Sequence, residues 1–144
     1  MPVPVSVHRL HPSAAIPAYQ TAGAAGFDLA ATGEVSVEPG QVVLVPTGLV
    51  IAVPEGYFLG VFARSSTPLK KGLMVANGVG VVDSDYCGPK DEIKIEVFNF
   101  TRETVVVRPG DRLAQGVLIP FARAEWHERS EMAQPTRGGF GATG

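Results

Sequence analysis

The segment from Gly78 to Gly88 has the sequence GVGVVDSDYCG and carries several residue types that can do chemistry. Asp83 ends an apolar run, where a carboxylate can orient a water molecule and take its proton. Tyr86 follows three residues later and can present its ring to a sugar. The alternative is a plain hairpin in which Ser84 and Asp85 only form the turn. We favour that alternative for Asp85 and a chemical role for Asp83.

The residues before Asp83 are suited to reading the edge of a nucleotide base. Gly78 and Gly80 let the backbone come close to a ligand because they have no Cβ atom. Main-chain N–H and C=O groups of this run can then hydrogen-bond to a base, and the amide of Asn77 adds a donor and an acceptor. The sequence therefore indicates a ligand-binding hairpin.

A second segment, Ala63-Arg64-Ser65-Ser66, has groups that bind phosphate. The guanidinium of Arg64 offers forked donors to phosphate oxygens, and the serine hydroxyls and the N–H groups at a helix start add more. An ordinary helix entry with a surface arginine is an equally good interpretation of this segment alone.

Two further segments give weaker signals. Asp28 lies between apolar neighbours, either as a buried structural partner, which is favoured from this segment alone, or as support for a charged site. Gln115 also has apolar neighbours and would need a protein or ligand partner if buried, because unpaired buried amides are costly. In the turn before it, Arg112 could pair with Asp111.

The C-terminal segment from Gln134 onward contains Pro135, four glycines and small polar residues in place of a packing pattern. Because Phe140 is its only large apolar side chain, we predict a mobile arm over 134–144. Plain disorder is the usual fate of such a composition. A phenylalanine close to Arg137 and Thr143 instead suggests a lid that stacks on a ring and touches phosphate.

Other chemistries find little support. The histidines have no visible metal-binding partners, and the single cysteine, Cys87, has neither a second cysteine for zinc nor a placed histidine to activate it. The chain has no glycine-rich loop of the G-x-x-x-x-G-K-S/T type. A net charge of −2 gives no broad field that would attract nucleic acid.

Length and composition describe one β-rich domain. The 144 residues suffice for one core, and the 17 glycines and 12 prolines demand many turns. Ile93, Ile95 and Val97 alternate with Lys94 and Glu96, which predicts a strand with one buried face. Many short strands separated by turns are typical of a sandwich, jelly roll or barrel. The other predicted strands are Val35–Val37, Val42–Val45, Leu49–Val53, Tyr57–Ala63, Val79–Val82, Thr104–Val107 and Gly116–Ile119.

The turns and the one predicted helix have clear signals. Pro39-Gly40 and Pro109-Gly110 fit the two central positions of type II turns, and Val53–Gly56 is a further turn. Thr67 as cap, with proline next and Gly72 as the end, predicts a short helix.

The chain shows no targeting or membrane segment. No apolar run approaches the roughly 18 residues of a membrane helix, and the N-terminus lacks a signal-peptide pattern. One cysteine fits a reducing compartment. We expect a soluble cytoplasmic protein, with a domain over 1–133 continuous with the arm over 134–144.

Taken together and in order, the five segments from Ala25 to Gly144 resemble the five signature motifs of the homotrimeric dUTPases. The resemblance implies an all-β, jelly-roll-like β-barrel with at most one short helix and a flexible arm. It implies hydrolysis of dUTP to dUMP and pyrophosphate, which keeps uracil out of DNA and supplies dUMP for thymidylate synthesis. It also implies a homotrimer whose sites each combine the first, second and fourth motifs of one subunit, the hairpin of another and the arm of the third.

The resemblance also assigns roles to single residues. Asp83 would activate water for attack on the α-phosphorus, and Tyr86 would pack against the deoxyribose and exclude a 2′-hydroxyl. Uracil would be read by Asn77 and by the backbone of Gly78, Val81 and Val82. The remaining substrate contacts would come from Arg64, Ser65, Ser66, Gln115, Lys94, Arg137, Phe140, which stacks over uracil, and Thr143, with Asp28 in the supporting charged shell.

Mg²⁺ is the cofactor that the resemblance implies. It would be held by substrate phosphates and water, with no ligand from protein side chains. An extended chain from Arg129 to Gly144 spans up to ~50 Å at ~3.3 Å per residue, enough to cross onto a neighbouring subunit.

Three features depart from the family pattern. The run Pro89–Glu92 is longer than in common members, which affects the placement of Lys94. Ala142 stands where the arm usually has serine. Pro135 occupies the usual position of the arm arginine, so Arg137 either takes that role by a shorter path or the contact is lost.

Two other functions remain open from the sequence. A deoxycytidine triphosphate deaminase shares the fold and an Arg-Ser-Ser segment, but it needs a glutamate to shuttle protons at C4, and none is evident near the hairpin. A catalytically silent nucleotide-binding module would also fit the altered arm. Ammonia release from dCTP would reveal the first, and analogue binding without pyrophosphate release the second.

Overall fold

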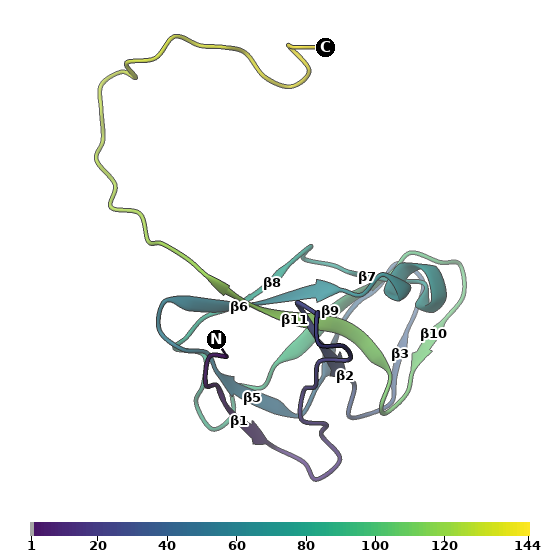
Figure 1. Cartoon of the computed structure of the whole chain (residues 1–144). Coiled ribbons are helices and arrows are strands. Elements are labelled where there is room, and N and C mark those ends of the chain that lie inside the picture. Colours follow the sequence, from purple (N-terminus) through teal and green to yellow (C-terminus); the bar gives the residue numbers. More distant parts are fainter. Residues whose placement is uncertain (1) are drawn as a thin grey trace.

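The computed structural model describes residues 2–144 and is built almost entirely of strands (Figure 1). The prediction of an all-β chain with one short helix is confirmed for these residues. In chain order the elements are β1 (Ser6–Arg9), β2 (Phe27–Ala30), β3 (Val35–Val37), β4 (Val42–Pro46), β5 (Leu49–Ala52), β6 (Tyr57–Ala63), η1 (Thr67–Lys71), β7 (Leu73–Val75), β8 (Gly80–Val82), β9 (Lys94–Asn99), β10 (Val105–Val107) and β11 (Arg112–Pro120).

The strands form four antiparallel sheets around one apolar core. The largest has the order β2-β11-β6-β8, and a second has the order β4-β9-β7. Two strand pairs, β1-β5 and β10-β3, complete the body. The predicted jelly-roll-like architecture is confirmed, although its hydrogen-bonded ladders stay open and do not close into a continuous barrel.

Alternation along β9 shows how the sequence builds this core. Ile93, Ile95 and Val97 are at most 2% exposed, whereas Lys94 points outward, as predicted. The strand ends on Asn99, which is fully buried and donates through Nδ2 to the carbonyl oxygens of residues 37 and 103 at 2.8 Å. A buried amide is tolerated here because its donors and its acceptor are all paired.

The predicted helix exists, but its first residue has a different role from the one expected. It is a single π-type turn over Thr67–Lys71 with Ser66 at the capping position, and Gly72 ends it at φ +69°. Thr67 is fully buried, and its hydroxyl donates to the carbonyl of Leu113 at 2.8 Å. The threonine therefore ties the helix to β11, and the prediction of Thr67 as the cap was wrong.

Both predicted type II turns have the required glycine conformation. Gly40 has φ +76° and Gly110 has φ +88°, values that an L side chain rarely adopts. The turns are closed by N–H donation from Gln41 to Glu38 at 3.1 Å and from Asp111 to Arg108 at 3.0 Å.

Beyond β11 the chain leaves the body as an extended segment. Residues 121–144 contain no helix or strand and are exposed throughout. In Figure 1 this segment runs away from the sheets and curves back at a distance, with Gln134–Gly144 as its far part. Among residues 2–144, no helix is long and apolar enough to span a membrane.

Candidate functional site

Asp28 is the centre of a charged cluster where β2 lies against β11. Its Oδ1 atom is 2.8 Å from Nε of Arg64, and its Oδ2 atom is 3.1 Å from Nη1 of Arg112. The Asp28 side chain is only 13% exposed. Both carboxylate oxygens of Asp28 are therefore paired with arginines, and its role in supporting a nucleotide site stays a prediction.

Arg64 is held from several sides. Its Nη1 atom donates to the carbonyl of Arg112 at 3.2 Å and lies 3.5 Å from the Ser66 hydroxyl. Its own backbone N–H donates to the buried hydroxyl of Thr67 at 3.0 Å. The guanidinium is thus fixed where β6 ends and the helix begins, beside the exposed Ser65.

The sequence interpretation that paired Arg112 with Asp111 is wrong. Asp111 lies 3.5 Å from Nζ of Lys71 and accepts from the Arg108 N–H at 2.9 Å, which closes the turn before β11. Arg112 is the first residue of β11 and lies opposite Ala30 of β2. Its side chain reaches along β2 to Asp28. Asp111 is held within the turn and Arg112 by the strand, so the two side chains have different partners.

Gln115 joins this cluster through β11. Its Nε2 atom donates to the carbonyl of Ala63 at 3.1 Å, so the partner that the sequence required is a protein group. A Cβ at Gly26 would lie 2.5 Å from Oε1 of Gln115, and the glycine is what makes room for the amide. Asp28, Arg64, Ser66 and Gln115 therefore form one site, which we call the arginine cluster.

The predicted hairpin begins at β8, on the other side of β6. Val61, Gly60 and Leu59 pair in turn with Gly80, Val81 and Val82. Gly78 has φ +74° and open space at its Cβ position, as a close-approaching ligand would need. A Cβ at Gly80 would instead lie 3.0 Å from Cβ of Val61, so this glycine is required by strand packing.

Asp83 and Tyr86 enclose the tight turn of the hairpin. The Tyr86 N–H donates to the carbonyl of Asp83 at 3.2 Å, so Ser84 and Asp85 occupy the central turn positions, as expected. Asp83 is exposed, and within residues 2–144 its carboxylate has no hydrogen-bond or ion-pair partner. Tyr86 is 42% exposed as a whole residue, and its hydroxyl donates to the carbonyl of Glu92 at 2.9 Å.

Within one chain the hairpin and the arginine cluster lie apart. Asp83 follows Val82, which is opposite Leu59 near the start of β6, whereas Arg64 follows the end of the same strand. At ~3.3 Å per strand residue this separation is about 20 Å. Lys94, at the start of β9, belongs to another sheet again.

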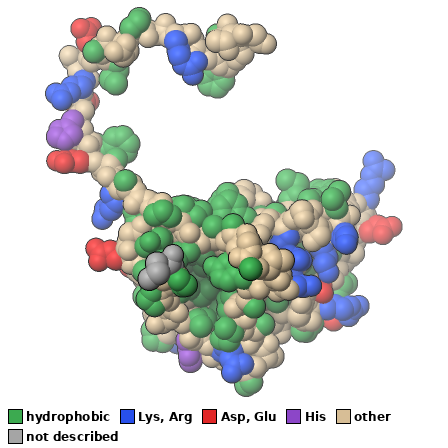
Figure 2. Space-filling model, viewed as in Figure 1, with side chains coloured by type: hydrophobic (Ala, Val, Ile, Leu, Met, Phe, Trp, Pro, Cys, Tyr) green, Lys and Arg blue, Asp and Glu red, His purple; other side chains and the backbone are tan. Residues whose placement is uncertain are grey.

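The arm residues stand away from both groups. Arg137, Phe140 and Thr143 are exposed, and Phe140 has a positive φ of 51° without any packing around its ring. In Figure 2 the arm stands clear of the body over most of its length. One chain therefore presents three separate groups of predicted site residues and does not assemble them.

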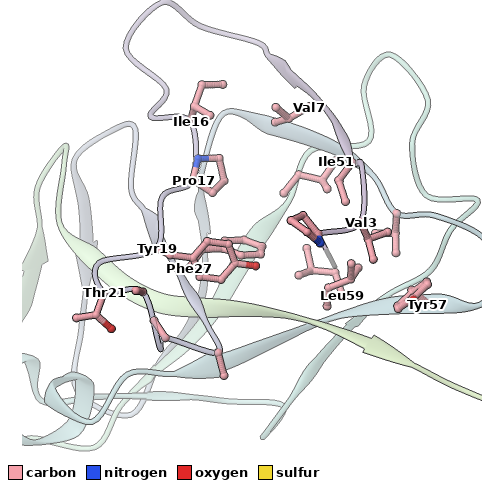
Figure 3. A pocket seen from close by; sticks show the side chains of 17 residues that line it. Val3, Val7, Ile16, Pro17, Tyr19, Thr21, Phe27, Ile51, Tyr57 and Leu59 are labelled. Carbon is pink, nitrogen blue, oxygen red and sulfur yellow. The ribbon is translucent and has the colours of Figure 1, made fainter.

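An open hollow beside β1 is not part of these groups. It has a volume of about 990 Å³ and lies beside β1, under side chains such as Ile16, Tyr19 and Phe27 (Figure 3). The rings of Tyr19 and Phe27 meet edge to face at 5.7 Å. Its lining is mostly apolar and contains none of the predicted nucleotide-binding side chains.

The charged side chains offer no protein cage for a metal. Over residues 2–144, no three His, Cys, Asp or Glu side chains gather as a possible ion site. The two carboxylates closest to the predicted chemistry are Asp28, which is occupied by arginines, and Asp83, which stands alone.

Two residues that position candidate site side chains were not identified from the sequence. Thr67 positions Arg64, and only a hydroxyl at a helix start signalled it. Glu92 accepts the Tyr86 hydroxyl through its backbone, which no sequence pattern reveals.

Comparison with known proteins gives one consistent family. The family model described as dUTPase matches residues 12–144. The deoxyuridine 5′-triphosphate nucleotidohydrolase of Wolinella succinogenes is 46% identical over 138 residues, covering 94% of this chain and 91% of the relative. The corresponding protein of Desulfitobacterium hafniense strain DCB-2 is 48% identical over 134 residues, covering 90% and 87%.

Solved structures agree with this result. The dUTPase of Streptococcus mutans superposes with a TM-score of 0.77 at 37% identity, over 85% of this chain and 98% of the other. The dUTPase of Staphylococcus bacteriophage 80alpha with dUPNHPP shares the fold at a TM-score of 0.87 and 22% identity, over 98% of each chain. The family match spans most of the chain and includes the arginine cluster, the hairpin and the arm, so the chain belongs to the dUTPase family.

Proposed function

We propose that this chain hydrolyses dUTP to dUMP and pyrophosphate. The observation that carries the proposal is the exposed carboxylate of Asp83, unpaired within residues 2–144, at the end of β8 in a chain of the dUTPase family. A carboxylate without a protein partner is available to bind a water molecule and accept its proton.

The separation of the three groups supports a site shared between copies of the chain. The arginine cluster and the hairpin of one chain are too far apart along β6 to contact the same nucleotide. The arm reaches away from its own body and is long enough to cross onto a neighbour (Figure 1). We therefore propose a homotrimer, with each site built from the arginine cluster of one subunit, the hairpin of a second and the arm of the third.

In the reaction, Asp83 would take a proton from a water molecule while the water oxygen attacks the α-phosphorus. The pyrophosphate leaves with the electron pair of the broken α–β bridging bond. Arg64, fixed by Asp28, would neutralise charge on the phosphate chain together with the Ser65 and Ser66 hydroxyls. Gln115 would donate the second N–H of its Nε2 atom to a phosphate oxygen, since the first donates to Ala63, and Arg137 and Thr143 would add phosphate contacts from the arm.

The hairpin would select the base and the sugar. The open backbone at Gly78 and the exposed amide of Asn77 can pair with uracil, and the backbone of Val81 and Val82 continues that edge. Cytosine would present a donor where uracil has an acceptor, which leaves mismatched polar groups. Tyr86 would cover the deoxyribose, while Lys94 lies near the nucleotide and Phe140 stacks over the base.

We propose that Mg²⁺ enters this site bound to the substrate. Bound to the triphosphate, it would supply charge neutralisation and a fixed phosphate shape. Arg64 and the serine hydroxyls hold the same phosphates from the protein side. We further propose a cytoplasmic role in which the reaction removes dUTP before it enters DNA and provides dUMP for thymidylate synthesis.

The first expected result concerns Asp28. Asp28→Asn removes the charge that fixes Arg64, so the guanidinium loses its orientation toward phosphate. We expect KM for dUTP to rise about tenfold, equivalent to about 1.4 kcal/mol, with a smaller change in kcat. Steady-state kinetics measure both.

Glu34→Gln is the matched control for this substitution. Glu34 also pairs with an arginine, Arg108, at 3.1 Å, but both side chains are more than half exposed. Such surface pairs contribute little, so kinetics should be unchanged. Equal KM values for Asp28→Asn and the unaltered protein would remove Asp28 from its supporting role.

A panel of dUTP, UTP, dTTP and dCTP tests the proposed function as a whole. With Mg²⁺ present, we expect pyrophosphate release from dUTP far above release from the other three. Ammonia release from dCTP would make the chain a deaminase. Tight binding of a non-hydrolysable dUTP analogue, with no pyrophosphate from dUTP, would make it a silent binding module.

A further inference from the structure

The loop that follows Tyr86 is closed by its own residues. The Gly88 N–H donates to Oδ2 of Asp91 at 2.8 Å, and the Asp91 N–H donates back to the Gly88 carbonyl at 3.1 Å. A Cβ at position 88 would lie 2.9 Å from the same carboxylate oxygen, so the closure is tight. We call Gly88–Glu92 the 88–92 loop.

The end of this loop is anchored to the body. Oε2 of Glu92 accepts from the backbone N–H of Gly48 at 2.8 Å, between β4 and β5. Next to it, the Ile93 N–H donates to Leu49 at 2.8 Å, and the Thr47 hydroxyl donates to Ile93 at 2.6 Å. Both Thr47 and Ile93 are almost fully buried. The position of Glu92 is therefore fixed by the core.

Tyr86 is connected to this anchored point through its far end. Its hydroxyl donates to the backbone carbonyl of Glu92 at 2.9 Å, although 42% of the residue is exposed. It makes no close ring pairing with another aromatic side chain of residues 2–144. A hydrogen bond at the tip of the ring holds the Cα–Cβ torsion, because rotation about that bond would carry the hydroxyl away from Glu92 and swing the ring aside.

We propose that the 88–92 loop, closed by Asp91 and anchored by Glu92, positions the Tyr86 ring and thereby sets the preference for deoxyribose over ribose. The proposal rests on the proposed function, in which this ring covers the sugar. A ring can exclude a 2′-hydroxyl only if it does not move aside. Asp91 and Glu92 are positioning residues, since they act through Tyr86 and not on the substrate.

The test compares three single variants within the loop. Asp91→Ala removes the acceptor for Gly88, Asp91→Asn keeps an oxygen acceptor there, and Lys90→Ala changes an exposed neighbour whose side chain forms no contact of this kind. For each we measure kcat/KM with dUTP and with UTP, and the Tm.

We expect Asp91→Ala to lower the dUTP-to-UTP ratio about fivefold, equivalent to about 1 kcal/mol, through better use of UTP, since one hydrogen bond is lost. The kcat for dUTP should stay within about twofold, because the ring covers the sugar and does not act on the reacting phosphorus. Asp91→Asn should restore most of the ratio, and Lys90→Ala should keep it. A loss that affected both substrates equally would indicate a structural role only and would overturn the proposal.

Tyr86→Phe keeps the inference testable if Asp91→Ala fails to fold. This variant removes only the hydroxyl bond to Glu92, so it should also lower the ratio, and an unchanged ratio would overturn the proposal. Calorimetric binding of dUMP and UMP separates the two claims. Suppose that the protein releases no pyrophosphate from dUTP, but that its binding preference for dUMP over UMP falls in Asp91→Ala. This result would refute the proposed hydrolysis and support the positioning of Tyr86 by the 88–92 loop. If the protein hydrolyses dUTP and Asp91→Ala keeps its preference for deoxyribose over ribose, only the proposed role of the 88–92 loop would be refuted.

Discussion

Asp83→Asn is expected to reduce kcat for dUTP by about 10²- to 10⁴-fold, the usual contribution of a positioned general base. The amide keeps the size of the side chain but cannot take a proton from water. Affinity for a non-hydrolysable dUTP analogue should stay within several-fold, a change of about 1 kcal/mol or less, because Asp83 makes no contact that holds the hairpin through its carboxylate. Single-turnover kinetics and analogue titration measure the two effects separately.

Asp85→Asn provides the matched control two residues away. Asp85 is exposed in the centre of the same turn, so this variant has the same charge change on the same hairpin. We expect near-normal turnover. Near-normal turnover in Asp83→Asn as well would remove Asp83 from the reaction, whereas equal losses in both variants would point to the charge of the hairpin rather than to a base.

Removal of the arm is the second change with a large expected effect. A chain ending at Gln134 should fold with an unchanged Tm, because residues 135–144 are exposed and contribute nothing to the core. It should lose about 10²-fold or more in kcat/KM, since a closing segment excludes water and completes the phosphate contacts. Unfolding curves and steady-state kinetics with dUTP check both statements.

Single substitutions in the arm divide this loss between its parts. Phe140→Ala tests stacking over the base, and Arg137→Ala tests the phosphate contact at its shortened distance from Phe140. If Arg137 takes that role, its removal should raise KM by about tenfold, as loss of one charge-assisted hydrogen bond does. Full activity in the truncated chain would show that the arm is dispensable.

The strand pattern was the most predictable part of the fold. The runs Val35–Val37 and Tyr57–Ala63 match β3 and β6 in full, because apolar β-branched and aromatic residues there are bounded by clear turn signals. β1 was not predicted, since Ser6–Arg9 is short, entirely exposed and paired only with β5. Its position depends on a distant partner that local sequence does not reveal.

The sequence proposes a set of site residues but does not give their geometry. The resemblance implied a charged shell around Asp28, but its two arginine partners come from positions 64 and 112, far along the chain. The contact of Tyr86 with a backbone carbonyl leaves no trace in residue types. Such contacts follow from how β2, β6 and β11 are paired, and that pairing is a property of the whole fold.

Hydrolysis of dUTP in ¹⁸O-labelled water tests the central claim most directly. If water activated by Asp83 attacks the α-phosphorus, mass spectrometry of a single turnover should find one ¹⁸O atom in dUMP and none in pyrophosphate. Label in the pyrophosphate would place the attack on another phosphorus and contradict the mechanism. Absence of both products, with dUTP left intact, would contradict the proposed function itself.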